Sequence, residues 1–239
     1  MPKIRYDLDQ PMGKLLELAG NKFGEVCFET VTIGNMSLDI LQIKDMPRYI
    51  EKLVGSAKPG KSVELPLWAK IWPSCLFLGF FLQQFPFKPE DELLEVGAGV
   101  AVIGLVAAKR GLHVTVSDLE DDALLFARIN ALKNGVEDKM DIAKADFTKD
   151  SLGRRFDHII GCEVLYNEAT YEPLADFLVD HLAERADSEV ILAMDRKREG
   201  RAFFNRAKGT FGIMRKDFSF TDKDSGEEQF INLFRMRRS

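Results

Sequence analysis

Residues 93–102, Leu-Leu-Glu-Val-Gly-Ala-Gly-Val-Ala-Val, have the types and spacing of a ligand-binding turn between a strand and a helix. A short apolar run reaches the acidic residue Glu95 and is followed by Gly97, Ala98 and Gly99. Glycines allow backbone torsions and a close approach of a ligand that a Cβ atom would prevent. In α/β sheets such a turn binds a nucleotide-type ligand outside the carboxyl ends of the strands.

This turn lacks the residues that bind phosphate groups. A dinucleotide-binding motif has a third glycine where this chain has Val102, and no Lys followed by Ser or Thr occurs within 97–108. Asp118 ends the next apolar run, 21 residues after Gly97, where a carboxylate can bind both ribose hydroxyls. An NAD-binding domain also has an acid there, so Asp118 alone does not distinguish the two ligands. Asp118 and the missing glycine together favour S-adenosylmethionine, held by Glu95, Gly97, Ala98, Gly99, Asp118 and Leu119.

Glu163 and Tyr166, in the segment Gly-Cys-Glu-Val-Leu-Tyr at 161–166, have side chains that could act on a methyl acceptor. Methyl transfer from a sulfonium is an in-line displacement, so the site must align a lone pair, exclude water and keep the nucleophile neutral. Glu163 could hold an incoming amine and pair with its developing positive charge. Tyr166 could line the channel around the aliphatic stem of that amine.

Three motifs resemble those of class I methyltransferases, and in particular family 16. This family is lysine methyltransferase-like and includes the group of the electron-transfer flavoprotein β-subunit lysine methyltransferase. The motifs are the glycine turn with Asp118, the stretch W-x-x-I-W-P-S at 68–74, and Glu163-x-x-Tyr166. The resemblance covers about residues 63–220. It implies a cofactor-dependent enzyme that converts S-adenosylmethionine to S-adenosylhomocysteine.

The resemblance also implies roles for further residues. The 68–74 segment is expected to pack over the cofactor with Trp72 in contact, whereas the role of Trp68 stays open because large aromatics usually cap a core. Asp146 is expected at the adenine amino group, although it could equally cap a turn. Phe147, where the family often has tryptophan, is expected to pack on the adenine face, and Cys162 to lie beside the cofactor. Ala101 also departs from the family, which usually has glycine at this position.

The hydrophobic periodicity predicts an α/β fold, a doubly wound Rossmann-like sheet of seven strands with helices on both faces. We expect parallel strands at 92–96, 113–117, 140–144, 157–161 and 188–194, closed by an antiparallel hairpin of 211–220 and 230–236 around a turn at 222–227. Residues 1–64 are predicted to be an extension with a β-hairpin (25–33 and 38–43), a helix over 47–53 and a loop at 55–62. Residues 65–239 are predicted to form the methyltransferase domain, with a helix over 76–82.

The composition restricts the class of acceptor. A net charge of −5 and an isoelectric point near 5.4 argue against a nucleic acid partner and suit a basic one. Three separated cysteines and three separated histidines indicate neither a disulfide framework nor a metal site. The polar start and short apolar runs predict a cytoplasmic protein with no membrane contact. The sequence predicts methylation of a lysine on a partner protein. A small-molecule amine acceptor and a non-catalytic, cofactor-binding scaffold stay open, as does the oligomeric state.

Overall fold

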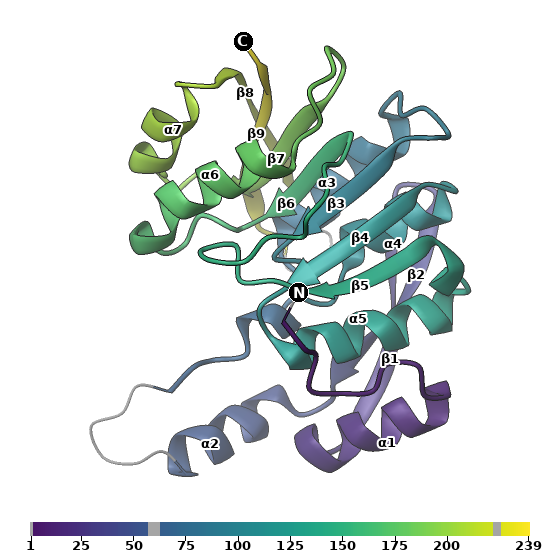
Figure 1. Ribbon diagram of the computed structural model, residues 1–239. Coiled ribbons are helices and arrows are strands. Elements are labelled where there is room, and N and C mark those ends of the chain that lie inside the picture. The colour runs from purple at the N-terminus through teal and green to yellow at the C-terminus, as the bar shows by residue number, and fades with distance from the viewer. Residues whose placement is uncertain (1, 57–62, 222–225) are drawn as a thin grey trace.

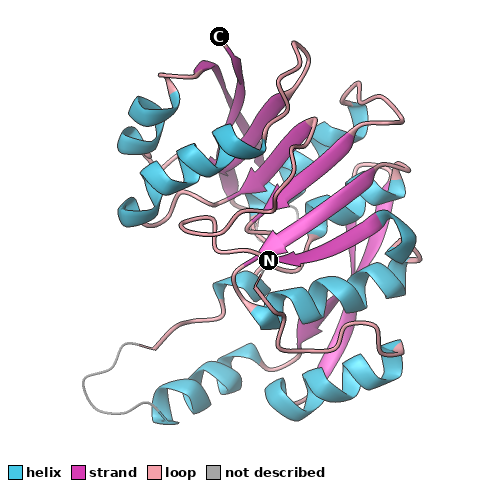
Figure 2. Ribbon diagram, viewed as in Figure 1, coloured by secondary structure: helices cyan, strands magenta, loops and turns pink. Residues whose placement is uncertain are grey.

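The computed structural model describes residues 2–56, 63–221 and 226–239. Its largest element is a seven-stranded sheet in the order β5-β4-β3-β6-β7-β9-β8 (Figures 1 and 2). The first five strands of this order are parallel, and β9 and β8 are antiparallel to their neighbours. The strands are β3 Glu92–Val96, β4 His113–Asp118, β5 Met140–Lys144, β6 His158–Cys162, β7 Glu189–Asp195, β8 Phe211–Thr221 and β9 Glu228–Arg238. The predicted fold class is confirmed.

Helices cover both faces of this sheet because the central strands are apolar on both sides. In β3, Leu93 belongs to one buried cluster and Leu94 to the other. The first cluster includes α3 Pro73–Gln84, α4 Val102–Lys109 and α5 Asp121–Asn134. The second includes α6 Tyr171–His181 and α7 Arg201–Ala207. The chain is therefore doubly wound, as the periodicity predicts.

The strand order reverses direction at β3. The chain runs outward from β3 to β4 and β5, and then returns to place β6 on the other side of β3. In open α/β sheets the ligand binds at such a reversal, outside the carboxyl ends of the strands. The turns after β3, β4, β5 and β6 therefore surround one location.

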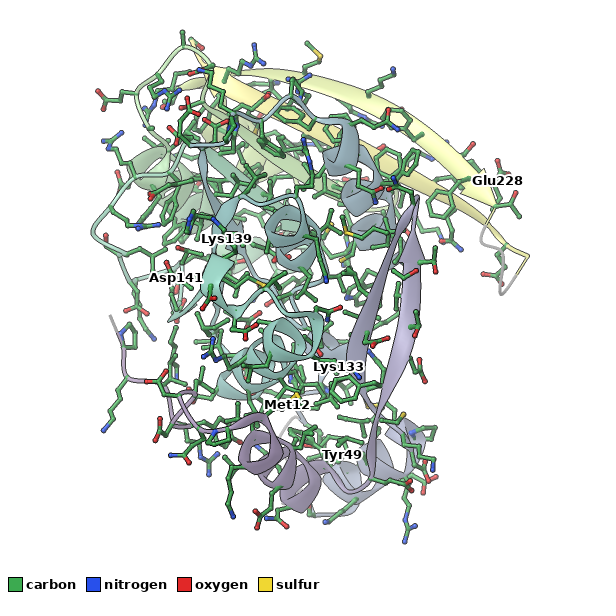
Figure 3. All side chains as sticks on the ribbon, turned by 90° about the vertical axis from the view of Figure 1, so that its right-hand side faces the viewer. Met12, Tyr49, Lys133, Lys139, Asp141 and Glu228 are labelled. Carbon is green, nitrogen blue, oxygen red and sulfur yellow. The ribbon has the colours of Figure 1, made fainter. Side chains whose placement is uncertain are left out.

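The N-terminal residues pack against the helical layer. They form α1 Met12–Phe23, the antiparallel hairpin of β1 Val26–Ile33 and β2 Met36–Ile43, and α2 Met46–Ser56. The buried Asn130 of α5 links this hairpin to the glycine turn, since its side chain accepts from Leu41 N (2.8 Å) and donates to Val100 O (3.0 Å). Figure 3 shows Lys133 of α5 beside this hairpin, where its ammonium group lies 5.0 Å from the centre of the Phe28 ring and 3.5 Å from the Asp39 carboxylate. Buried residues of the 1–64 extension and of the main domain belong to one hydrophobic cluster. The domain boundary after residue 64 therefore stays a prediction.

Several elements differ from the sequence prediction. The strand predictions are confirmed to within two residues at every end, and the largest difference is in β9, which extends two residues beyond the prediction at both ends. The helix α1 is missing from the prediction, and α3 begins at Pro73, three residues early. The helix predicted over 47–53 is α2, which continues to Ser56 and so replaces the first two residues of the predicted loop. The loop at 55–62 and the turn at 222–227 fall largely outside the described residues.

Candidate active site

The glycine turn after β3 has three residues in the left-handed region: Gly97 (φ 61°), Gly99 (φ 53°) and Ala101 (φ 61°). A Cβ atom on Gly99 would lie 2.6 Å from the carbonyl oxygen of Trp68, so only glycine fits there. A Cβ on Gly97 would lie 3.0 Å from the side chain of Val164. The turn is thus packed between the 63–72 segment and the residues that follow β6.

Glu95 lies behind this turn rather than at its open side. Its carboxyl group is buried and accepts a hydrogen bond from Gly104 N at 2.8 Å, in the first turn of α4. This bond satisfies one of the free N–H groups at the start of the helix, where the N-cap residue Ala101 has no side chain that could do so. Burial raises the pKa of Glu95 to about 8, against the opposing effect of the Gly104 hydrogen bond. Glu95 therefore holds the turn in place, and its contact with the cofactor stays a prediction.

Asp118 connects the ends of β3 and β4. One carboxylate oxygen accepts from Gly99 N (2.8 Å) and the other from Glu120 N (2.9 Å). The side chain remains partly exposed, so each oxygen keeps an acceptor position for a ribose hydroxyl. Leu119, the next residue, is 50% exposed and offers an apolar surface at the same edge.

Acidic residues that follow β4 and β5 lie near Tyr166, which follows β6. Burial, and then the carboxylates of Asp118, Glu120 and Asp146, raise the pKa of the Tyr166 hydroxyl. Burial, followed by Asp118 and Glu64, raises the pKa of Glu120. Burial also raises the pKa of Asp118, against the opposing effect of the backbone hydrogen bonds from Glu120 and Gly99. The edge is therefore rich in acidic side chains, which suits a sulfonium cofactor and an ammonium group.

Glu163 lies directly after β6 with a left-handed backbone (φ 52°) and a buried side chain. Its Oε1 accepts from the Ser74 hydroxyl (2.8 Å) and from Asp195 N (2.7 Å). Its Oε2 accepts from Arg198 Nε at 3.2 Å. A carboxylate has about four acceptor positions, so one on Oε2 remains available.

The two tryptophans have different surroundings. The Trp68 ring packs in the core, with its centroid 5.0 Å from that of Phe126 and 5.7 Å from that of Phe23. Its backbone approaches the glycine turn at Gly99. Trp72 is the N-cap residue of α3 and its partly exposed ring lies under the Lys70 ammonium group at 4.2 Å. The structure thus assigns Trp68 to the core, and the cofactor contact of Trp72 stays a prediction.

Asp146, Phe147 and Cys162 complete the predicted set. Asp146 caps its own turn by accepting from the Thr148 hydroxyl (2.6 Å) and backbone (3.0 Å), and this hydrogen bonding lowers its pKa. The Phe147 ring is partly buried, 6.4 Å from that of Phe177. Burial and contact with Cys75 raise the pKa of the Cys162 thiol well above its ordinary value, so this cysteine is uncharged.

These residues fit an adenosyl cofactor. The glycine turn allows close backbone approach, Asp118 keeps acceptor capacity, and Leu119 offers a half-exposed apolar surface. Within the described ranges no cluster of three or more metal-ligating side chains occurs, and no helix is long and apolar enough to cross a membrane.

A model of the lysine methyltransferase family matches residues 63–210 of the 239-residue chain. The chain belongs to this family. As a lysine methyltransferase family member it is an S-adenosylmethionine-dependent methyltransferase, which confirms the predicted cofactor and enzyme class.

Two curated relatives illustrate this family. Protein N-lysine methyltransferase METTL21A of Xenopus tropicalis is 27% identical over 178 residues, covering 72% of this chain and 78% of the relative. EEF1A lysine methyltransferase 3 of the same organism is 25% identical over 175 residues, covering 71% and 75%.

Solved structures show the same fold. The glycopeptide N-methyltransferase MtfA with S-adenosyl-L-homocysteine aligns with a TM-score of 0.56 at 12% identity, over 81% of this chain and 98% of that one. Ribosomal protein L11 methylase from Lactobacillus delbrueckii subsp. bulgaricus aligns with a TM-score of 0.52 at 23% identity, over 68% and 76%.

Two side chains that bind Glu163 have no role in the sequence prediction for this member of the lysine methyltransferase family. Ser74 stands in the W-x-x-I-W-P-S motif but is 89 positions from Glu163, and Arg198 is 35 positions away in a run of charged residues. For Ser74, the W-x-x-I-W-P-S motif itself indicates a role in the site. No local pattern distinguishes Arg198 from Arg196 and Arg201.

Proposed function

We propose that this methyltransferase transfers the methyl group of S-adenosylmethionine to the ε-amine of a lysine on a partner protein. One observation carries the proposal: Val164, the residue after Glu163, is packed against Gly97 of the glycine turn. This contact keeps the acid of the Glu163-x-x-Tyr166 motif beside the residues that fit the cofactor. The names of the two relatives, both protein lysine methyltransferases, support a protein acceptor.

The side chains have distinct tasks in this proposal. When bound, S-adenosylmethionine supplies an activated methyl group. Asp118 binds the ribose hydroxyls and fixes the Gly99 amide at the same time. The remaining acceptor position of Glu163 Oε2 receives an N–H of the lysine amine and sets its direction. Tyr166, 58% exposed, lines the channel along the aliphatic stem.

The acceptor amine must lose a proton before it can attack. The ordinary pKa of a lysine is about 10.4, so at neutral pH about one amine in a thousand or fewer is a nucleophile. The site must therefore lower the pKa of the bound amine by desolvation or by its charges. We also propose a cytoplasmic location, supported by three cysteines that are all free thiols.

The acceptor class is tested by incubating the protein and methyl-labelled S-adenosylmethionine with host lysate, and then separating proteins, nucleic acids and small molecules. The proposal expects label in protein. Label confined to small molecules would support an amine metabolite as acceptor and overturn the proposal. Cofactor binding without any transfer would point to a scaffold.

A further inference from the structure

The Glu163 carboxylate forms an ion pair with Arg198. Arg198, in the loop between β7 and α7, bonds Oε2 through Nε, and its side chain is 35% exposed while that of Glu163 is 7% exposed. Within the described part of the chain, the two terminal guanidinium nitrogens of Arg198 donate to no other group. The acid at the proposed acceptor position is therefore one half of an ion pair.

The other groups around Glu163 are neutral or act through the backbone. Ser74 from α3 donates a hydroxyl, and Asp195 at the end of β7 donates its backbone N–H while its carboxylate accepts from Lys197 N. The thiol of Cys162 is protonated because burial raises its pKa, and it contacts Cys75 of α3. The Tyr166 hydroxyl is protonated for the same reason. Arg198 is the charged side chain that bonds Glu163, and Asp195 lies beside this pair. Asp118, Glu120 and Asp146 lie near Tyr166 at the same edge, and Glu95 lies near Cys162. These four acids are the same in the wild type and in every variant of the pair, so a change at Arg198 or Glu163 alters the charge of the pair alone.

A lone carboxylate at this position would be unfavourable for the reaction. An opposite charge within about 4–6 Å favours the charged form of an amine and raises its pKa by about one to three units. A carboxylate already paired with a guanidinium exerts little net field, yet it can still accept a hydrogen bond and orient the nitrogen. The pair can therefore direct the amine without stabilising its unreactive, protonated form.

We propose that Arg198 is a positioning residue that balances the charge of Glu163, so that the acceptor lysine loses its proton near neutral pH. This inference rests on the proposed function. The amine nitrogen releases its proton to water and then forms the bond to the transferred methyl carbon. The electron pair of the broken carbon–sulfur bond stays on sulfur, and the positive charge passes from sulfur to nitrogen, which can then release a second proton to water.

The test measures kcat against pH at saturating cofactor, with the lysate protein that the wild type labels most strongly as acceptor. In Arg198→Met the unpaired carboxylate should move the midpoint of the profile to higher pH by about one unit or more. In Glu163→Gln the unpaired guanidinium should move the midpoint to lower pH, even though the maximal kcat falls. The double variant, with neither charge, should return close to the wild type. The midpoint of Arg198→Lys should also stay close to that of the wild type. Lys197→Met removes a neighbouring cation that does not touch Glu163, so it should leave the midpoint unchanged.

A second readout does not depend on turnover. With S-adenosylhomocysteine bound, n-butylammonium serves as a probe of the lysine side chain in calorimetric titrations near pH 7. Arg198→Met should bind it about tenfold more tightly than the wild type, and Glu163→Gln more weakly. Thermal unfolding of each variant identifies those that have lost the fold. If Arg198→Met has lost it, Glu163→Gln and the double variant carry the test, since the first should move the midpoint to lower pH and the second should return it.

The inference is overturned if Arg198→Met lowers kcat at every pH with an unmoved midpoint, or if both single variants move the midpoint in the same direction. Either result would leave the proposed function intact and make Arg198 merely structural. If the wild type labels no protein, the proposed function fails. The butylammonium titration then decides by itself whether Arg198 balances the charge of Glu163.

Discussion

At the scale of single residues, the carboxyl edge of the sheet uses its acids in different ways. Glu95 is buried behind the glycine turn, Asp118 bridges two turns at the edge, and Glu163 is held by hydroxyl, amide and guanidinium donors. The protein environment therefore determines the task of each carboxyl group.

Glu163→Gln should separate turnover from cofactor binding. The amide loses one of the two acceptor oxygens and leaves Arg198 unpaired, so the amine is no longer oriented, and a positioned acid–base group is worth about 10²-fold or more in rate. We expect kcat to fall by about that factor while calorimetric affinity for S-adenosylmethionine stays nearly constant. Asp118→Ala is the matched control, and it should weaken cofactor binding by about 1.5–3 kcal/mol. Loss of cofactor affinity in Glu163→Gln with normal turnover at saturation would place Glu163 in the cofactor site instead.

Glu95 should make the stability of the free protein fall at alkaline pH. Its pKa is about 8 in the folded protein and 4.5 ordinarily, so the folded state binds a proton more tightly. The stabilisation is complete below the lower value and is lost as pH rises through the higher one. It amounts to a few kcal/mol at most, since one pKa unit corresponds to about 1.4 kcal/mol. Glu95→Gln does not titrate, so urea unfolding near pH 6 and near pH 9 should show a smaller difference than in the wild type. An equal difference in both proteins would contradict the assignment.

At the scale of elements, the features that depend on local sequence patterns could be predicted, whereas those that depend on long-range contacts could not. The strands and the hairpins follow from apolar periodicity and turn residues, which are local. Helix α1 was missed because Gly13 and Gly20 lower its helix propensity, and its buried stripe of Leu15, Ala19 and Phe23 gains its stability from packing on other elements.

The same division holds within the site. The glycine turn, Asp118 and the Glu163-x-x-Tyr166 motif are short patterns and could be read directly from the sequence. The partners of Glu163 could not be, because Ser74 and Arg198 reach it only through the tertiary fold. The direction in which Glu95 points is equally invisible in the sequence, since it depends on Gly104 leaving room for the carboxyl group.

The glycine turn itself is tested by Gly99→Ala. The added methyl group would meet the Trp68 carbonyl oxygen at 2.6 Å, and the left-handed backbone adds strain. Because a backbone carbonyl cannot move aside easily, the turn should shift and cofactor affinity should fall about tenfold or more, about 1.4 kcal/mol. Gly111→Ala is the control: it also has positive φ (88°), but its Cβ would meet nothing within 4 Å. It should cost stability alone, and equal loss of cofactor affinity in both variants would contradict this account.

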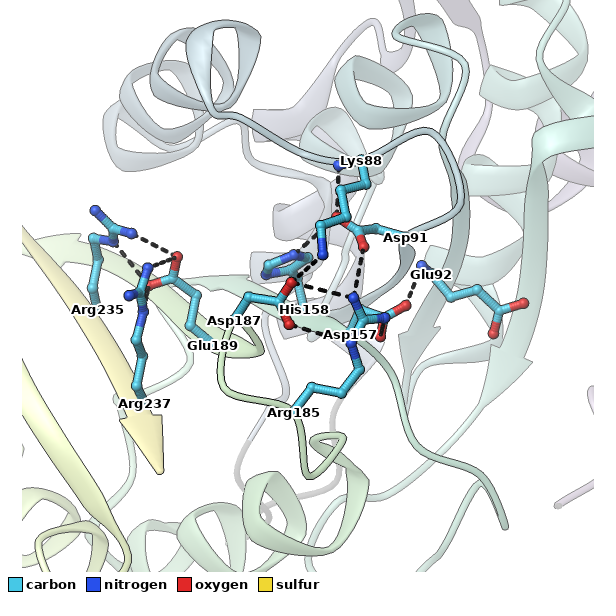
Figure 4. A network of polar contacts seen from close by, with 10 residues as sticks. All are labelled: Lys88, Asp91, Glu92, Asp157, His158, Arg185, Asp187, Glu189, Arg235 and Arg237. Atoms are coloured by element: carbon cyan, nitrogen blue, oxygen red, sulfur yellow. Dashed lines mark hydrogen bonds and ion pairs between the residues drawn. The ribbon is translucent and has the colours of Figure 1, made fainter. Parts of the chain in front are cut away.

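At the scale of the whole molecule, the two edges of the sheet have separate roles. Figure 4 shows the network at the amino-terminal edge, where the buried Glu189 meets Arg235 and Arg237 of β9, and Asp91 meets His158. Burial would raise the pKa of Glu189, but the hydrogen bonds from the two arginines outweigh it and lower that pKa. This edge joins strands β3, β6, β7 and β9 and lies opposite the candidate active site.

Arg235→Met combined with Arg237→Met should therefore reduce stability without altering the active site. The two changes leave Glu189, 1% exposed, as an unpaired buried charge, which costs about 3–5 kcal/mol. Adding Glu189→Met should restore most of this loss, because an apolar replacement of a buried ion pair is often neutral. Chemical denaturation measures the stability, and calorimetry should show unchanged affinity for S-adenosylmethionine in the folded variants. A parallel fall in cofactor affinity would show that the two edges are coupled.

The central claim is that the carboxyl edge of the sheet methylates lysine on a protein, and amino-acid analysis of the labelled protein tests it most directly. Protein labelled by the wild type with methyl-labelled S-adenosylmethionine is hydrolysed, and the radioactive residue is compared with standards of methylated lysine, arginine and histidine. The account predicts label in methylated lysine, and a loss of about 10²-fold in Glu163→Gln. Label in methylated arginine or histidine, or undiminished lysine methylation by Glu163→Gln, would contradict it.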